Sequence, residues 1–172
     1  MLDHSDLSRF LLTFLGCLLV LFTIELLNPV QANVIQPFTT GLAWISAAIV
    51  LPFDESVLSS GRILRDSVTG FAVSIESGFN GVEATIVLIA GVIAFPATLK
   101  QKFLAITLGF LAIQALNVVR IISLFYLGMW NFDIFEWTHL YLWPVLIMLD
   151  VLLVFAIYLR WLTRETVTAA HA

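Results

Sequence analysis

The chain has 172 residues, of which 60% are hydrophobic and only 12% charged, and its formal net charge is −4. Soluble domains carry about 25% charged residues, so this composition excludes an ordinary water-soluble domain and indicates one integral membrane domain. The small acidic charge, without basic runs, argues against nucleic-acid binding. The single cysteine, Cys17, excludes an intrachain disulfide and a cysteine-based metal site.

Four apolar stretches are long enough to cross a hydrocarbon core of about 30 Å. They cover residues 9–27, 82–99, 103–128 and 139–162. We expect each to be a transmembrane helix of an all-α membrane protein with residues 1–172 as a single domain. The apolar run at residues 39–52 is shorter, which is typical of a re-entrant or interfacial helix.

Positively charged residues predict the orientation, because short cytoplasmic loops are enriched in Lys and Arg. Arg9 precedes the first span, Lys100 and Lys102 follow the second, and Arg160 ends the fourth. Four crossings with both termini in the cytoplasm place all these charges on one side. Residues 28–81 then form an external segment.

The external segment contains a candidate β-hairpin. Phe71, Val73 and Ile75 alternate with smaller or polar residues, which is the period of two that a strand requires. Residues 63–66 are the candidate partner strand, and residues 67–70 are the candidate turn.

Five polar residues are expected near the outer boundary of the membrane. A helix rises about 1.5 Å per residue, so distance along the chain from the basic residues at the cytoplasmic side gives the depth in the membrane. This count places Glu83, Arg120 and His139 about 26–31 Å from the cytoplasmic side. Asn80 and Asn117 lie close to them in the sequence. Ionisable residues at membrane depth are costly and usually face a bundle interior or a wet cavity, so we predict a functional site there. The structural alternatives are an Arg120–Glu83 ion pair, a snorkelling Arg120 and an interfacial His139.

Other polar residues are expected deeper in the membrane. Asp150 and Gln114 lie about 15 and 18 Å from the inner edge, where they could meet as a packing contact or a proton relay. Glu25 is expected near the outer end of the first span. A small transporter subunit with these residues as its polar path is one alternative function, although the sequence shows no inverted repeat. Cys17, about 12 Å from the inner edge, is more typical of an apolar filler than of a nucleophile.

Several short motifs resemble a known family in their order and spacing. They are Gly78-Phe79-Asn80-Gly81-Val82-Glu83-Ala84, Phe95-Pro96-Ala97, Asn117-Val118-Val119-Arg120-Ile121, and His139 at the start of the next span. Together they resemble the exosortase/archaeosortase family, in particular its short exosortase H type. The resemblance covers about residues 60–160.

The resemblance implies a cysteine peptidase or transpeptidase of the bacterial inner membrane, with its active site facing the periplasm or exterior. Such proteins process C-terminal sorting tails, which consist of a short motif, a transmembrane helix and a basic cluster. The resemblance assigns the catalytic arginine to Arg120 and the catalytic histidine to His139. It implies no metal or other cofactor.

The expected catalytic cysteine is replaced by Phe79, either as a natural loss or as an introduced change. A phenyl ring cannot act as a nucleophile, so we expect the chain as written to be inactive in cleavage. Asn80, Glu83 and Asn117 would support the site. A further alternative is a non-catalytic protein that binds sorting tails or a membrane partner through the same pocket.

Overall fold

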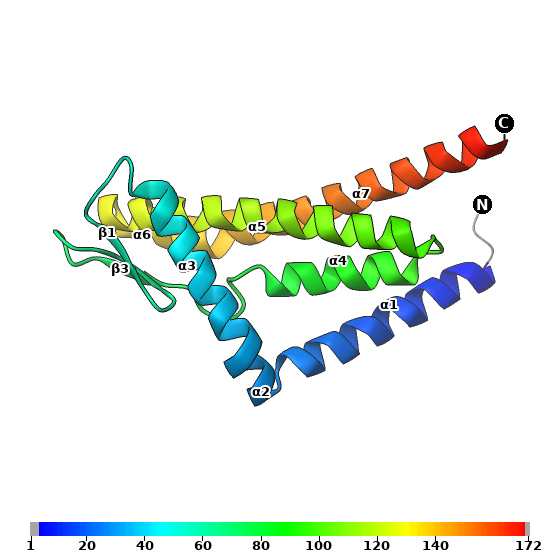
Figure 1. The fold of residues 1–172 in the computed structure, drawn as a ribbon, viewed down its shortest axis with the longest axis horizontal. Coiled ribbons are helices and arrows are strands. Elements are labelled where there is room, and N and C mark those ends of the chain that lie inside the picture. Colours follow the sequence, from blue (N-terminus) through cyan, green and yellow to red (C-terminus); the bar gives the residue numbers. More distant parts are fainter. Residues whose placement is uncertain (1–3, 171–172) are drawn as a thin grey trace.

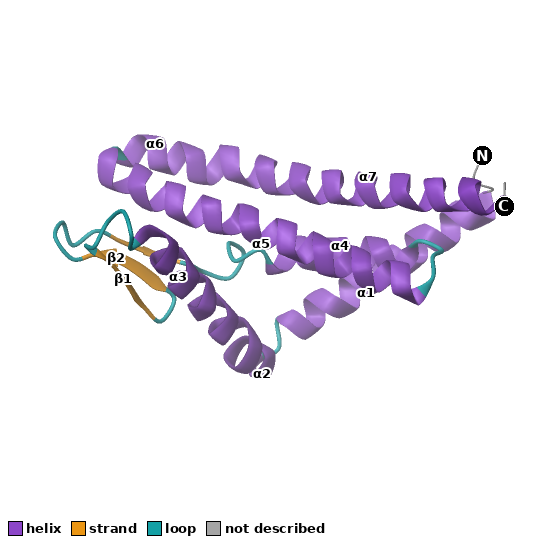
Figure 2. Cartoon of the chain, turned by 45° about the horizontal axis from the view of Figure 1, so that its top comes forward, coloured by secondary structure: helices purple, strands orange, loops and turns teal. Residues whose placement is uncertain are grey.

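The computed structural model describes residues 4–170, with the side chains of residues 6–163. In chain order its elements are α1 (His4–Glu25), α2 (Asn28–Val30), η1 (Gln31–Ile35), α3 (Gln36–Val50), β1 (Val57–Ser60), β2 (Ile63–Asp66), β3 (Ala72–Ser74), α4 (Val82–Ala94), α5 (Leu99–Trp130), α6 (Phe132–Trp137), η2 (Thr138–Leu142) and α7 (Trp143–Ala170). α1 begins and α7 ends at one end of the molecule, whereas the sheet lies at the opposite end (Figure 1 and Figure 2).

Four helical segments of the described chain are long and apolar enough to cross a membrane. They are Asp6–Glu25, Asn28–Val50, Leu99–Trp130 and Phe132–Thr163. Many of their large apolar side chains are exposed, which suits contact with lipid rather than with water. The prediction of a mostly helical protein with about four such helices is confirmed.

The segment before the sheet is longer than predicted. The helix expected at residues 39–52 is the end of a continuous helical segment that begins at Asn28. Polar residues between 28 and 36 lower the local hydropathy, but they are compatible with helix. Pro37 lies inside this continuous helical segment, just after the π-helical turn Gln31–Ile35, where the Gln36 N–H donates to the Gln31 carbonyl.

The predicted span at residues 82–99 is shorter than expected, because α4 ends after 13 residues. Phe95 precedes Pro96 and has an extended backbone, with φ −82° and ψ 138°, as steric contact with the proline ring favours. Thr98 and Gln101 then form a capping box at the start of α5. α4 therefore rises only about 20 Å.

The sheet has three antiparallel strands in the order β1-β2-β3. In the central strand, Leu64 pairs with Ser59 on one side and with Val73 on the other. The hairpin of β2 and β3 is confirmed. β1 was not predicted, because residues 57–60 do not alternate clearly between apolar and polar side chains.

Asp66 stabilises the turn of this hairpin. Its carboxylate accepts hydrogen bonds from the Ser56 hydroxyl, from the backbone N–H groups of Val68 and Thr69, and from the Thr69 hydroxyl. These bonds, chiefly that from Ser56, lower the pKa of Asp66 from 3.8 to about 2.

Two apolar clusters hold the fold together. The first lies between the sheet, α3 and α5 and includes Leu42, Leu64 and Phe125. The second joins α4, α5 and α7 and includes Leu88 and Ile113. α1 packs mainly against α4. The first cluster fixes the sheet against α5, and this arrangement positions the site described next.

Candidate functional site

Residues 75–81, between β3 and α4, carry Phe79 in a tightly held loop. Gly78 and Gly81 have φ values of 88° and 77°, which glycine adopts without the strain that other residues would incur. The Glu83 carboxylate accepts a 2.6 Å hydrogen bond from the Gly78 N–H. The loop conformation is therefore set by glycines and by the first turn of α4.

Buried amides connect this loop to two neighbouring helices. The Asn80 side chain is fully buried and donates to the Thr39 hydroxyl of α3 at 3.2 Å. Gln114 of α5 donates to the Gly81 carbonyl at 3.4 Å and accepts from Asn117 at the same distance. Asn80 and Asn117 are thus positioning residues, and neither lines the cavity described below.

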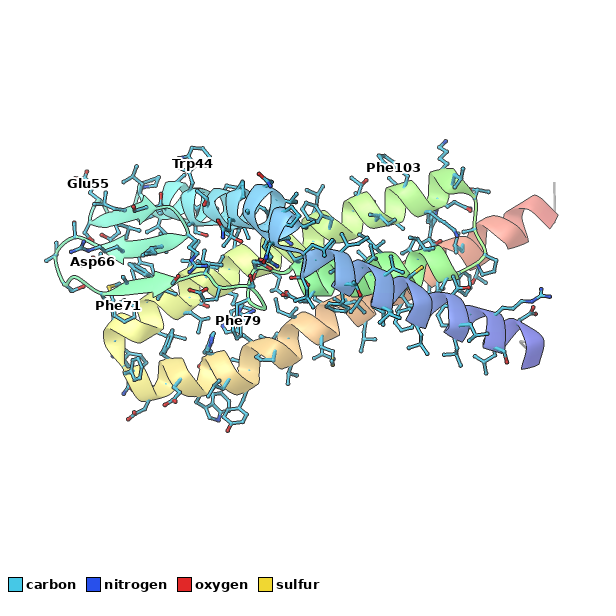
Figure 3. The ribbon with its side chains drawn as sticks, turned by 90° about the horizontal axis from the view of Figure 1, so that it is seen from below. Trp44, Glu55, Asp66, Phe71, Phe79 and Phe103 are labelled. Carbon is cyan, nitrogen blue, oxygen red and sulfur yellow. The ribbon has the colours of Figure 1, made fainter. Side chains whose placement is uncertain are left out.

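Phe79 lies against both ionisable residues that the sequence singles out. The Arg120 Cζ atom is 4.9 Å from the centroid of the Phe79 ring, a distance suited to a cation–π contact. The His139 ring centroid is 4.6 Å from the same ring, at an interplanar angle of 38°. Figure 3 shows Phe79 between the sheet and the helices α5 to α7. Three separate segments thus meet at the phenyl ring.

Arg120 and His139 each carry a buried nitrogen without a hydrogen-bond partner in the described chain. These are Nη2 of Arg120, whose residue is only 4% exposed, and Nδ1 of His139. The alternative of an Arg120–Glu83 ion pair does not apply, since the ion pair found among the described side chains is Arg62–Glu76 at 3.0 Å. An unpaired buried polar group costs about 1–3 kcal/mol; Nη2 of Arg120 lacks an acceptor, and Nδ1 of His139 lacks either a donor or an acceptor, according to the tautomer of the ring.

A π-helical turn and an aromatic stack orient His139. The residue lies in η2, and its ring stacks on that of Phe135 with centroids 5.6 Å apart and planes at 2°. Asn131 caps the preceding α6 by accepting from the N–H groups of Asp133 and Ile134. Single π-helical turns are rare and frequently occur at functional sites. Here the turn places the imidazole beside the Phe79 ring.

A cavity of about 260 Å³ opens beside these residues, between the sheet and the helices. It is lined by β3 with its flanking residues, by Phe79, and by residues of α5, α6 and η2. Its aromatic lining residues are Phe71, Phe79, Phe132 and Phe135, and its polar ones are Ser74, Arg120 and His139. The cavity is therefore a mostly apolar pocket with one guanidinium and one imidazole. A larger apolar cavity of about 400 Å³, between α5 and α7, contains no Asp, Glu, Lys, Arg or His.

The deeper polar residues do not join this site. Gln114 bonds to the loop rather than to Asp150, and no hydrogen bond between the two is found among the described residues. The backbone carbonyl of Glu25 accepts from Gln31 at 2.9 Å. Cys17 lies on α1 and lines neither cavity. The polar residues expected of a transporter path are thus not linked to one another.

Sequence reasoning missed three parts of the site. Thr39 was placed in an interfacial helix, with no indication that it would hold Asn80. Phe135 precedes His139 by four residues, a helical spacing at which side chains meet, and this signal could have identified the stack. The role of β3 as a wall of the cavity depends on tertiary packing and has no local signal.

The arrangement offers a hydrogen-bond-donating cation and an imidazole at the wall of an apolar pocket. In the described part of the chain, no group of three His, Cys, Asp or Glu side chains is placed to hold a metal ion. Comparison of the chain with protein-family models, with curated proteins and with solved structures found no match.

Proposed function

We propose that the chain is an exosortase-like membrane protein whose cavity receives C-terminal sorting tails, and that it retains the site of a cysteine peptidase or transpeptidase without the nucleophile. The observation that carries this proposal is the contact of Phe79 with both Arg120 and His139. A thiol on the Cβ of residue 79 would face the same guanidinium and imidazole.

With such a thiol the site would hold the groups that acyl transfer needs. The imidazole of His139 would take the thiol proton, and the thiolate would attack a peptide carbonyl. The C–N bond would then break, and His139 would return the proton to the leaving amine. Arg120 would stabilise the negative oxygen of the intermediate. An acceptor amine, hydroxyl or water would then attack the thioester carbon and give its proton to His139, the C–S bond would break, and His139 would return the proton to the departing thiolate of residue 79.

Phe79 removes this chemistry while leaving the pocket in place. A phenyl ring has neither a dissociable proton nor a nucleophilic lone pair, so the chain as written binds a tail without cleaving it. This non-catalytic binding is favoured by the unpaired Nη2 and Nδ1 atoms of Arg120 and His139, which need a partner whether or not cleavage follows.

We place the protein in the bacterial cytoplasmic membrane with the cavity facing the exterior and both termini in the cytoplasm. The start of α5, which carries Lys100 and Lys102, lies at the same end of the molecule as the start of α1 and the end of α7 (Figure 1). Basic residues at that end favour the cytoplasmic side. A membrane-impermeant thiol reagent should therefore label a Phe79→Cys protein in intact spheroplasts, and failure to label it without membrane disruption would contradict this orientation.

The function is tested by Phe79→Cys in a Cys17→Ala background, so that the introduced thiol is the only one. The protein is co-expressed with a protein from the same genome that ends in a short motif, an apolar span and an arginine-rich tail. We expect cleavage of the tail with Phe79→Cys and none with the parent chain. Adding His139→Ala should lower the cleavage rate at least about a hundredfold, as expected for loss of an acid–base group.

Co-purification of the parent chain with the tailed protein is the second readout. Tail binding that requires Arg120 and His139, without cleavage by Phe79→Cys, would support binding alone and reject the peptidase site. Neither binding nor cleavage, with both proteins folded in the membrane, would reject the proposal as a whole.

A further inference from the structure

β3 forms one edge of the sheet, and its odd-numbered residues are paired with β2. The Phe71 carbonyl accepts a 2.9 Å hydrogen bond from the Asp66 N–H, and the Ile75 N–H donates to the Arg62 carbonyl at 3.0 Å. Leu64 and Val73 are partners between these two pairs. In an antiparallel ladder, hydrogen-bonded positions alternate along each strand.

The alternation leaves the backbone groups of Ala72 and Ser74 directed away from β2. No other strand pairs with this edge in the described sheet, since the strand order ends at β3. Both residues line the 260 Å³ cavity. The unpaired edge of β3 therefore borders the pocket, whose other walls include residues of α5, α6 and η2.

An unpaired edge of this kind binds an extended chain, because a strand supplies donors and acceptors at the matching repeat. We propose that the cavity takes an extended peptide as a fourth strand on β3, held by the main-chain groups of Ala72 and Ser74. This inference rests on one part of the proposed function, namely that the cavity receives a peptide. It adds that the peptide is recognised through its main chain, by pairing with β3.

The side chains of the pocket favour a peptide over a lipid tail. The unpaired Nη2 of Arg120 complements a carbonyl oxygen of an extended chain, and Nδ1 of His139 complements either an N–H or a carbonyl oxygen of it, whereas an acyl chain would leave both atoms unsatisfied. The aromatic lining can contact alternate side chains of the peptide. The three residues of β3 extend over about 10 Å, which is enough for two hydrogen-bonded positions of a partner strand.

The positions of Phe71 and Phe79 indicate the direction of the bound peptide. Phe71, just before β3, lies farther from the α1 and α7 ends than Phe79 does (Figure 3). β3 therefore runs toward the helical body. In a sorting tail the motif comes before the transmembrane helix, so the tail also runs from the sheet end toward the helical body. The bound motif would therefore be a strand parallel to β3.

The experiment uses peptide electrophiles on the full chain with Phe79→Cys and Cys17→Ala, so that no sorting tail is required. The probe is acetyl-tetra-alanine chloromethyl ketone, in which the thiolate displaces chloride to form a thioether. Four further probes carry a single N-methyl group at each alanine nitrogen in turn. Each alkylation rate is divided by the rate with iodoacetamide, which corrects for the reactivity of the thiol itself.

Strand addition predicts a period of two in these rates. N-methylation at alternate nitrogens should slow alkylation by about fivefold for each hydrogen bond lost, and N-methylation at the intervening nitrogens should leave it unchanged. Equal effects at all four nitrogens, or no effect at any, would overturn the inference. This holds whether or not a sorting tail is cleaved, so failure here and failure of the proposed function are distinguishable.

A pair of proline variants tests the protein side. Ser74→Pro removes a free N–H from the β3 edge, whereas Ser59→Pro removes the corresponding group from the opposite edge of the sheet, on β1. Ser74→Pro should abolish the advantage of the peptide probe over iodoacetamide, and Ser59→Pro should retain it. Retention of the full advantage in folded Ser74→Pro would contradict the inference, and if that variant does not fold, the N-methyl series decides alone.

Discussion

Arg120 is expected to lower the stability of the fold that it serves. The residue is 4% exposed, has no ion-pair partner in the described chain, and carries an Nη2 atom without an acceptor. Replacing it by a methionine of similar length removes the charge and keeps an apolar side chain against Phe79. We predict that Arg120→Met raises the free energy of unfolding while it abolishes tail binding.

The size of the gain follows from the cost of burying the charge, less the attraction of that charge to the Phe79 ring and to the Glu83 carboxylate. Burying an ion costs several kcal/mol even after the protein has relaxed around it. The cation–π contact with Phe79 returns about 2 kcal/mol where the charge is desolvated. The difference leaves a net cost for the native arginine, so Arg120→Met should stabilise the protein by about 2 kcal/mol.

Reversible unfolding of the detergent-solubilised protein in sodium dodecyl sulfate, followed by tryptophan fluorescence, measures this difference. Arg62→Met is the matched control, because Arg62 is 46% exposed and forms a surface ion pair with Glu76. That control should change stability by less than about 0.5 kcal/mol. A loss of more than about 1 kcal/mol in Arg120→Met would refute the reasoning, because it would show that the charge has stabilising partners in the folded protein.

Two further predictions concern the loop and the sheet. Gly81→Ala should destabilise by at least about 2 kcal/mol in the same unfolding assay, since it adds left-handed strain and a Cβ only 2.9 Å from Gln114 Nε2. Gly61→Ala, with φ 55° and open space around its Cβ, should show only the strain of about 1 kcal/mol, and equal losses would contradict the contact. Because the pKa of Asp66 is lowered from 3.8 to about 2, its stabilisation is complete above about pH 4 and is lost as the pH falls toward 2. Asp66→Asn should remove this part of the pH dependence in hydrogen exchange of β2, and an unchanged profile would rule out the carboxylate as its source.

Counting along the helices predicted that Arg120 and His139 lie near each other, because the rise of a helix is constant. Counting from the inner basic residues placed Arg120 and His139 at similar depth, and both line the same cavity. Counting could not predict which way each side chain turns. The carboxylate of Glu83 bonds to a loop amide rather than to Arg120, since two left-handed glycines bring that amide over the start of α4.

The apolar segments were predicted better than the connections between them. Hydropathy identifies long buried or lipid-facing runs, but it underestimates a helix such as Asn28–Val50 that mixes amides with apolar residues. The strand β1 and the link between Asn80 and Thr39 depend on contacts between distant parts of the chain. Catalytic roles for Arg120, His139 and position 79 stay a prediction.

The shortness of α4 makes the site sensitive to the thickness of its bilayer. With 13 residues, the helix rises about 20 Å and falls about 10 Å short of an average hydrocarbon core. Residues 75–81 make up the difference with irregular backbone, which is tolerated at that depth only where protein or water satisfies it. A thicker, sterol-like or long-chain membrane would raise the lipid boundary along this loop and close water off from the cavity. If the cavity receives a peptide as proposed, hydrophobic mismatch would couple the lipid composition of the membrane to the access of peptide and water to Arg120 and His139.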